Sequence, residues 1–268
     1  RDYYASRGLG DVYKRQWPYR KRVTWRGWRR HEGMPPYSFP GSGYRPQARG
    51  PGMPGPYIQS WKKVSTIAKH IQTQSEWEQT MARRVMEQLR GELYLDQRYL
   101  TAALGALPAA PQESGGSFAT DGGALYYPTA WLLDTYRRNR RYLPRAYLHS
   151  LFHCIFRHLW LRDKRDPDLW GLACDIAVES TLDTLNTAAT KRPVGWVRQQ
   201  CYTQLRQSCK FLAAGPIYRV LTKTDAETLN KWQREFYTDS HRLWPADPDS
   251  PAAQMRGKQW ENLGRQTE

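Results

Sequence analysis

Apolar residues recur at helical spacing along most of the chain after about residue 60. A different pattern interrupts them at residues 117–127, where small and aromatic residues flank Asp121-Gly122, a pair that favours a tight turn with positive φ. We expect a short β-hairpin there, with Asp121 as a turn residue, and a loop over the Pro-, Ser- and Gly-rich residues 108–116. The expected helices are 61–89, 93–107, 128–136, 145–162, 169–185, 195–212 and 226–237. The pattern predicts an α+β fold that is mostly helical, with a small β-hairpin or sheet.

The two ends of the chain lack this periodicity. Residues 17–57 are rich in Pro, Gly and Arg, which is typical of a disordered tail or of upstream DNA translated in frame. Residues 6–16, SRGLGDVYKRQ, match the translation of a transposon-based sequencing adapter, so we expect residues 1–16 not to belong to the natural protein. We expect the folded domain at residues 58–245 and a linker at residues 246–268.

The formal net charge of +16 would suit a nucleic-acid partner. However, residues 1–60 hold 12 basic and 3 acidic residues, whereas the rest of the chain holds 29 and 22. Because most of the excess positive charge lies in this first segment, a basic nucleic-acid-binding protein is the weaker alternative.

Apolar runs and cysteine spacing in the sequence indicate the cellular compartment of the protein. It has no apolar run of about 18 residues that could span a membrane, and its N-terminal region lacks the apolar run of a secretory signal. Its four cysteines show no CxxC spacing and are expected to be reduced, mostly buried thiols. These features predict a cytoplasmic protein without a membrane partner.

The expected helix at 145–162 contains a pair of histidines at metal-chelating spacing. His149 and His153 are four residues apart, so their imidazoles differ by about 40° around a helix and project side by side. This HxxxH geometry chelates zinc in helix-based hydrolases, although the motif by itself is a weak signal. The surrounding residues are apolar nearly all round, which indicates a central buried helix whose two imidazoles need polar partners.

The next expected helix supplies those partners. Asp175 and Glu179 are also four residues apart on an otherwise apolar segment, and buried carboxylates are rarely left unpaired. One metal site explains both helices: His149, His153 and Asp175 as ligands, with Glu179 as a fourth ligand or as a group that contacts a ligand.

Two further histidines are weaker candidates for this site. His158 lies about 140° round from His153 if the helix stays regular, so we expect a histidine that caps the helix end, with metal ligation as the alternative. His241 could approach the site as a ligand or electrophilic helper, but a structural hydrogen-bonding role is favoured.

These residues together resemble a known family. The segment HSLFHCIFRHLWLRDKRDPDLWGLACDIAVES, starting at His149, resembles the bacterial VWA-like putative metallopeptidases, whose pattern runs HExxHxxxxH, a charged loop and LWxxAxDxxxN/E. Residues 89–107 and 118–136 are similar to the family's leading helix and hairpin, and FYTDSHRLW at 236–244 is similar to its Asp-x-His-x-x-Trp segment. The resemblance covers about residues 80–245.

The resemblance implies a zincin-like fold, in which a zinc-binding helix lies beneath a small sheet whose edge strand can hold an extended peptide. It also implies a following VWA-like domain, truncated here after the linker, and a MoxR-type AAA+ ATPase as a partner.

This chain departs from the family at one position. The family has Glu directly after the first histidine, where it acts as general base, and this chain has Ser150. The favoured hypothesis is a zinc-binding metallopeptidase-like domain with weak or absent proteolysis. The alternative is an active zinc hydrolase that uses another acid, such as Glu179.

Overall fold

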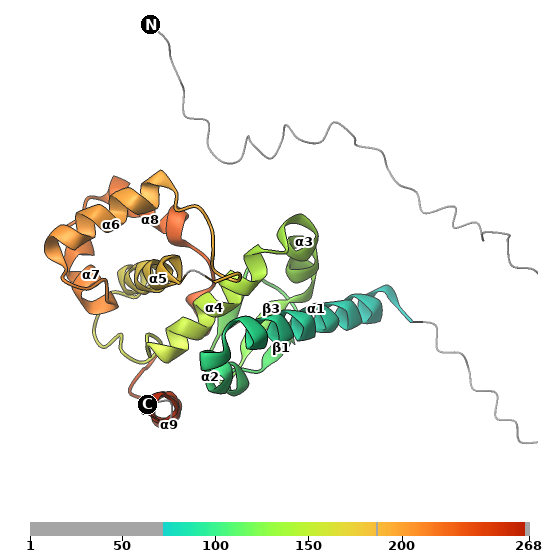
Figure 1. Cartoon of the computed structure of the whole chain (residues 1–268). Helices are drawn as coiled ribbons and strands as arrows, with labels where there is room; N and C mark the ends of the chain where they lie inside the picture. The colour runs from blue at the N-terminus through green and yellow to red at the C-terminus, as the bar shows by residue number, and fades with distance from the viewer. Residues whose placement is uncertain (1–71, 186, 266–268) are drawn as a thin grey trace, which may run out of the picture. The chain divides into compact units, whose positions relative to one another are not determined.

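The computed structural model describes residues 72–185 and 187–265 (Figure 1). The predictions for residues 1–57, and the first part of the helix expected at 61–89, lie outside these residues. The described part of the chain is mostly helical with a small three-stranded sheet, so the α+β prediction is confirmed. None of the helices in this part combines the length and apolar character that a membrane span requires.

Helix α1 spans Gln74–Asp96 and begins with a capping box. The Thr73 hydroxyl accepts a hydrogen bond from the Glu76 backbone, and the Glu76 carboxylate accepts one from the Thr73 backbone. The helix continues to Asp96, beyond the expected end at residue 89. The prediction of one separate helix over residues 93–107 is therefore wrong, because residues 93–96 belong to α1. A 3-10 turn at Arg98–Leu100 separates α1 from the short helix α2 at Thr101–Ala106.

Seven more helices lie in the described residues after the sheet. They are α3 Thr129–Asn139, α4 Tyr142–Ile155, α5 Pro167–Thr184, α6 Trp196–Ser208, α7 Ala214–Leu221, α8 Ala226–Phe236 and α9 Pro251–Arg265. Helices α4 and α5 pack against each other where two apolar cores meet (Figure 1). The first core is built mainly from α1–α4, the sheet and α9, and the second from α5–α8. The α4–α5 pair therefore lies at the centre of the described domain.

The sheet has the strand order β1-β3-β2, with β1 at Ala109–Gln112, β2 at Ala119–Thr120 and β3 at Leu125–Pro128. Strands β2 and β3 are antiparallel and form the expected hairpin. In the turn between them Gly122 has φ +80°, and a Cβ there would collide with the Trp160 ring. Strand β1 pairs in parallel with β3, so the expectation of a loop over residues 108–116 is wrong for residues 109–112.

Helix α4 ends at Ile155, earlier than the expected Arg162. Arg157 has φ +60°, a left-handed conformation that a continuous helix cannot contain. The chain turns back here, and the His158 backbone N–H bonds to the His153 carbonyl. The angular placement expected for His158 therefore fails, because it assumed a regular helix.

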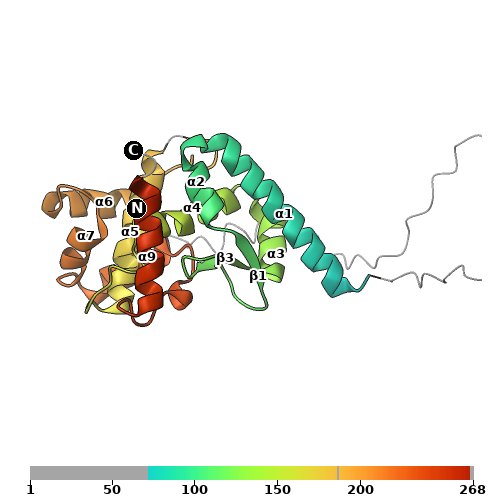
Figure 2. The same cartoon turned by 90° about the horizontal axis from the view of Figure 1, so that it is seen from below.

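Helix α9 lies in a segment where a linker was expected (Figure 2). Trp260 is buried in the first core, and its Nε1 donates a hydrogen bond to the Gly122 carbonyl at 2.8 Å. Gly257 lets the helix approach the Trp160 ring closely. The helix contacts α4 as well, so Pro251–Arg265 are part of the packed domain.

Candidate metal site

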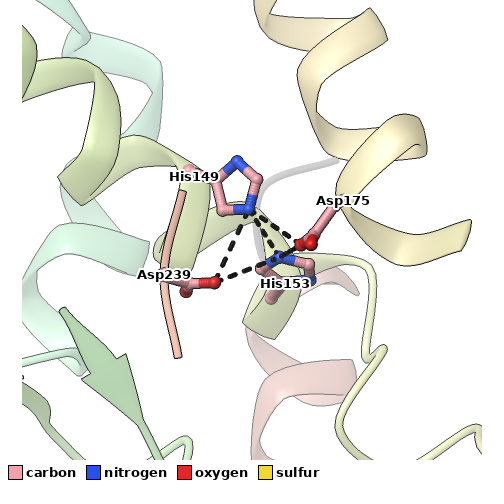
Figure 3. A group of neighbouring side chains, drawn as sticks. All are labelled: His149, His153, Asp175 and Asp239. Carbon is pink, nitrogen blue, oxygen red and sulfur yellow. Dashed lines mark hydrogen bonds and ion pairs between the residues drawn. The ribbon is translucent and has the colours of Figure 1, made fainter. Parts of the chain in front are cut away.

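Two histidines of α4, an aspartate of α5 and an aspartate that follows α8 meet in the interior of the domain (Figure 3). They are His149, His153, Asp175 and Asp239, called the His-Asp group below. One ligand atom from each lies within 4.8 Å of those of the other three. All four residues are buried.

Both histidines direct Nε2 to the centre of the group, and both aspartates direct Oδ1 there. The two Nε2 atoms are 2.9 Å apart. Asp175 Oδ1 lies 3.1 and 3.2 Å from them, and Asp239 Oδ1 lies 3.7 and 3.9 Å from them. Four ligands placed about 2.0 Å from a zinc ion would be separated by about 3.3 Å at the corners of a tetrahedron. The separations among the two Nε2 atoms and Asp175 Oδ1 are close to that value, and Asp239 Oδ1 lies a few tenths of an ångström farther from both histidines.

Local structure explains why these side chains converge. His149 and His153 share one face of α4 because they are four residues apart, and α5 packs against α4 with Asp175 on the facing side. Asp239 does not lie on a helix and is positioned by pairing of its neighbour with the sheet. The Ser240 backbone N–H donates to the Phe118 carbonyl at 2.8 Å, and Ser240 forms a parallel bridge with Ala119 of β2. This pairing with the sheet edge holds the segment beside α4. It also places the chain's own backbone at the β2 edge.

Three members of the His-Asp group are held from the outer side by a further side chain. The contacts are His149 Nδ1 with Glu179 Oε1 at 2.8 Å, His153 Nδ1 with His158 Nδ1 at 3.1 Å, and Asp239 Oδ2 with Ser150 Oγ at 2.5 Å. Ligands in protein metal sites are commonly oriented in this way by partners on the side away from the ion.

The outer contacts determine which atoms of the group can accept a hydrogen bond or a metal. Glu179 requires a proton on His149 Nδ1, and a proton on His153 Nδ1 satisfies the contact with His158. Both Nε2 atoms then face two carboxylate oxygens as acceptors, and the contact of Asp239 Oδ1 with His241 Nε2 at 3.1 Å lacks hydrogen-bond geometry. A cation satisfies all four acceptors, and a divalent cation also balances the two carboxylate charges. The residues therefore fit a metal ion.

The pKa values in the group agree with a ligand set. Burial lowers the pKa of His153 to about 4, which keeps this imidazole neutral. Burial opposes ionisation of Asp239, but its close contact with His241 and the charges of the neighbouring imidazoles outweigh burial and lower its pKa to about 2. Burial also opposes protonation of His149, yet hydrogen bonds to Asp175 and Glu179 raise its pKa to about 9. Without an ion, protons on His149 and on the neighbouring His241 place positive charge beside the two carboxylates.

Glu179 lies behind His149, on the side away from the centre of the His-Asp group. Its carboxylate also forms ion pairs with three arginines, Arg145, Arg192 and Arg198. Burial would raise the pKa of Glu179, but its bond to His149 and the arginine charges hold that pKa well below its usual range. Glu179 is therefore a partner of a candidate ligand, and this geometry argues against Glu179 as a substitute base at the centre.

His241 lies next to the group on its more exposed side. Its Nε2 is 3.1 Å from Asp175 Oδ1 and 3.1 Å from Asp239 Oδ1, and its side chain is 23% exposed. The ring stacks on Trp244 with centroids 3.8 Å apart, and a Cβ on Gly171 would lie 2.8 Å from its Nδ1. Burial would lower the pKa of His241, but the charge of Asp175 and the close contacts with both aspartates raise it to about 10.

A comparison with protein families agrees with this geometry. A family model described as a putative metallopeptidase domain matches residues 66–258. The chain belongs to this family. The matched residues contain the complete His-Asp group and the helices that hold it, and the suspected family resemblance is confirmed. No curated protein and no solved structure matches the chain.

The structure brings together more residues than the sequence indicated. His149, His153 and Asp175 converge, Glu179 contacts His149, and His158 contacts His153 from outside the group. Asp239 was missed as a candidate ligand, although it begins the Asp-x-His-x-x-Trp segment that contains His241. That segment was the available signal, but the sequence did not show which of its side chains reaches the histidines.

Proposed function

We propose that this protein binds one divalent metal ion, zinc, through His149, His153, Asp175 and Asp239, as a metallopeptidase-like domain with little or no proteolysis. The observation that carries this proposal is the convergence of four acceptor atoms, three of which belong to side chains held from the outer side by a further residue. Two imidazoles and two carboxylates suit zinc among the common divalent ions, although manganese and iron accept similar ligands.

Bound zinc polarises carbonyl oxygens and lowers the pKa of water. Peptide hydrolysis also needs a group that accepts a proton, and this chain's residues do not offer one at the family's position. The Ser150 hydroxyl donates a hydrogen bond to Asp239, and a serine does not act as a base near neutral pH. Glu179 is engaged by His149 and arginines. Loss of a general base typically lowers a rate by about 10²–10⁴.

The metal content of the purified protein tests this proposal. Wild-type protein prepared without chelator should contain about one zinc per chain by elemental mass spectrometry, and His149→Ala should lose it. Cys154→Ala is a matched control, because Cys154 is equally buried on the same helix and lies outside the His-Asp group. Absence of metal from wild-type protein, even after incubation with zinc, would refute the proposal.

A second experiment tests the missing base. Ser150→Glu returns a carboxylate to the position where the family has one. We expect this variant to hydrolyse an unstructured peptide at least about 10²-fold faster than wild type, as the usual contribution of a general base implies. If the variant folds and binds zinc without any gain in hydrolysis, the domain lacks a competent substrate site. The absence of proteolysis is then not explained by the serine at position 150.

Cellular context is proposed on more limited grounds. The four cysteines are free and buried, which supports a reducing, cytoplasmic location. Family resemblance supports a MoxR-type AAA+ ATPase as the partner, acting with a VWA-like domain that would follow this one. Co-purification of the natural full-length protein with the ATPase, in the presence and absence of ATP, would test this partnership.

A further inference from the structure

Ser150 has a specific role in the geometry of the His-Asp group. Its side chain is fully buried on α4, between the two histidines in sequence. Its hydroxyl donates to Asp239 Oδ2 at 2.5 Å, a distance typical of a strong hydrogen bond to a carboxylate. The other oxygen of the same carboxylate faces the two Nε2 atoms. Ser150 therefore contacts the Asp239 carboxylate on the side opposite the candidate metal position.

Asp239 has particular need of such a contact because it does not lie on a helix. It lies in the short non-helical segment that follows α8, and Ser240 attaches that segment to the sheet edge through its backbone. The backbone contact places the residue, but rotation about the side-chain bonds still has to be restricted. The hydrogen bond from Ser150 restricts it, with Oδ1 directed into the group. An ionised glutamate at position 150 has no proton to donate and could not make this contact.

We propose that Ser150 is a positioning residue that fixes Asp239 as the fourth protein ligand of the metal ion and thereby closes the metal site. The inference rests on the metal-binding function proposed above. Four protein ligands are typical of structural zinc sites, whereas catalytic sites keep one position for water or substrate. With four protein ligands, the site would hold the ion without an open position for water or substrate.

Zinc affinity measured by competition with a chromophoric chelator tests the role of the hydroxyl. Removing a partner of a metal ligand typically costs about 10–100-fold in affinity, and we expect that loss for Ser150→Ala. Asp239→Ala should weaken binding at least as much, and the double variant no more than Asp239→Ala. Ser180→Ala is the control, because that buried hydroxyl donates to the Ala177 carbonyl of its own helix. Ser150→Thr, which keeps a hydroxyl, should restore most of the affinity.

Cobalt(II) in place of zinc tests the closure, because its visible spectrum reports the number and type of ligands. We expect acetohydroxamate to leave the spectrum of the wild-type cobalt protein unchanged, since no position is open. The same addition should change the spectrum of the Asp239→Ala protein, in which a position has been opened. The wild-type arm of this experiment needs no variant and holds even if a substitution prevents folding.

The outcomes separate this inference from the function on which it rests. If wild-type protein binds no metal, both fail. If it binds zinc while Ser150→Ala binds equally tightly, the positioning role is refuted and metal binding stands. Additive losses in the double variant also refute the positioning role. A hydroxamate-induced change in the wild-type cobalt spectrum would overturn the closure.

Discussion

Glu179 connects the candidate metal site to a buried cluster of charges, and replacing it should affect both. Glu179→Gln keeps the shape of the side chain and removes its charge. Arg145 and Arg198 are almost fully buried beside it, and breaking a buried ion pair typically costs about 3–5 kcal/mol. Asp183 remains within 2.6 Å of Arg145 and compensates part of the loss. We therefore expect a decrease of about 3 kcal/mol in the free energy of unfolding, at the lower end of that range.

The same substitution weakens the partner of His149. An amide oxygen at position 179 can still accept the Nδ1 proton, but it polarises the imidazole less than a carboxylate does. We expect the zinc affinity to fall about 10-fold, the small end of the effect seen when such partners are removed. Urea denaturation of the zinc-free protein and chelator competition measure the two effects separately.

Asp183→Asn is the matched control for Glu179→Gln. Asp183 pairs with Arg145 and accepts a hydrogen bond from Tyr202, and within the described residues it forms no hydrogen bond or ion pair with the His-Asp group. This control should lower the stability of the zinc-free protein to a similar extent and leave zinc affinity unchanged. The reasoning is refuted if Glu179→Gln costs no stability, or if Asp183→Asn weakens zinc binding as much as Glu179→Gln does.

Three further predictions concern metal removal, α9 and the β2–β3 turn. Excess chelator should lower the melting temperature of wild-type protein but not that of His149→Ala. A free zinc concentration about 1,000 times Kd stabilises a folded protein by about 4 kcal/mol. Identical melting curves of wild-type protein with and without chelator would contradict metal binding. Trp260→Ala should destabilise the domain by about 3–5 kcal/mol in urea, whereas an exposed linker would give almost no change. Burial opposes ionisation of Asp121, but hydrogen bonds from Gly123 and Arg256 lower its pKa below the usual 3.8. Wild type should therefore exceed Asp121→Asn in stability above about pH 5, and this difference should shrink as pH falls through the lowered pKa; a constant difference between pH 2 and 7 would exclude this ionisation.

Most of what the sequence predicted correctly depends on residues close together in the chain. The four-residue spacing of His149 and His153 places them on one helical face whatever the surrounding fold. The hairpin around Asp121 follows from the conformation that its turn requires. Because a buried carboxylate needs a partner, Asp175 is predicted to lie beside the histidines, and the helices that carry them, α4 and α5, do pack together.

The features that the sequence did not predict depend on pairing between distant segments. Strand β1 contains a proline and has no alternation, and it becomes a strand because it pairs with β3. Helix α9 has a polar sequence, and its packing depends on Trp260 reaching a carbonyl in the β2–β3 turn. Asp239 enters the metal site because Ser240 pairs with the sheet edge. Local periodicity contains no information about any of these contacts.

Ser150 combines both kinds of information. From the sequence it is a departure from a family pattern, and a departure by itself says only that a base is missing. In the structure its hydroxyl is hydrogen-bonded to the one member of the His-Asp group that does not lie on a helix. Any buried hydroxyl needs a hydrogen-bond partner, and here that partner is the outer oxygen of a candidate ligand. The contact with Asp239 therefore favours a changed role for this position over simple decay. A lower zinc affinity of Ser150→Ala than of wild type would support the changed role, and an unchanged affinity would support simple decay.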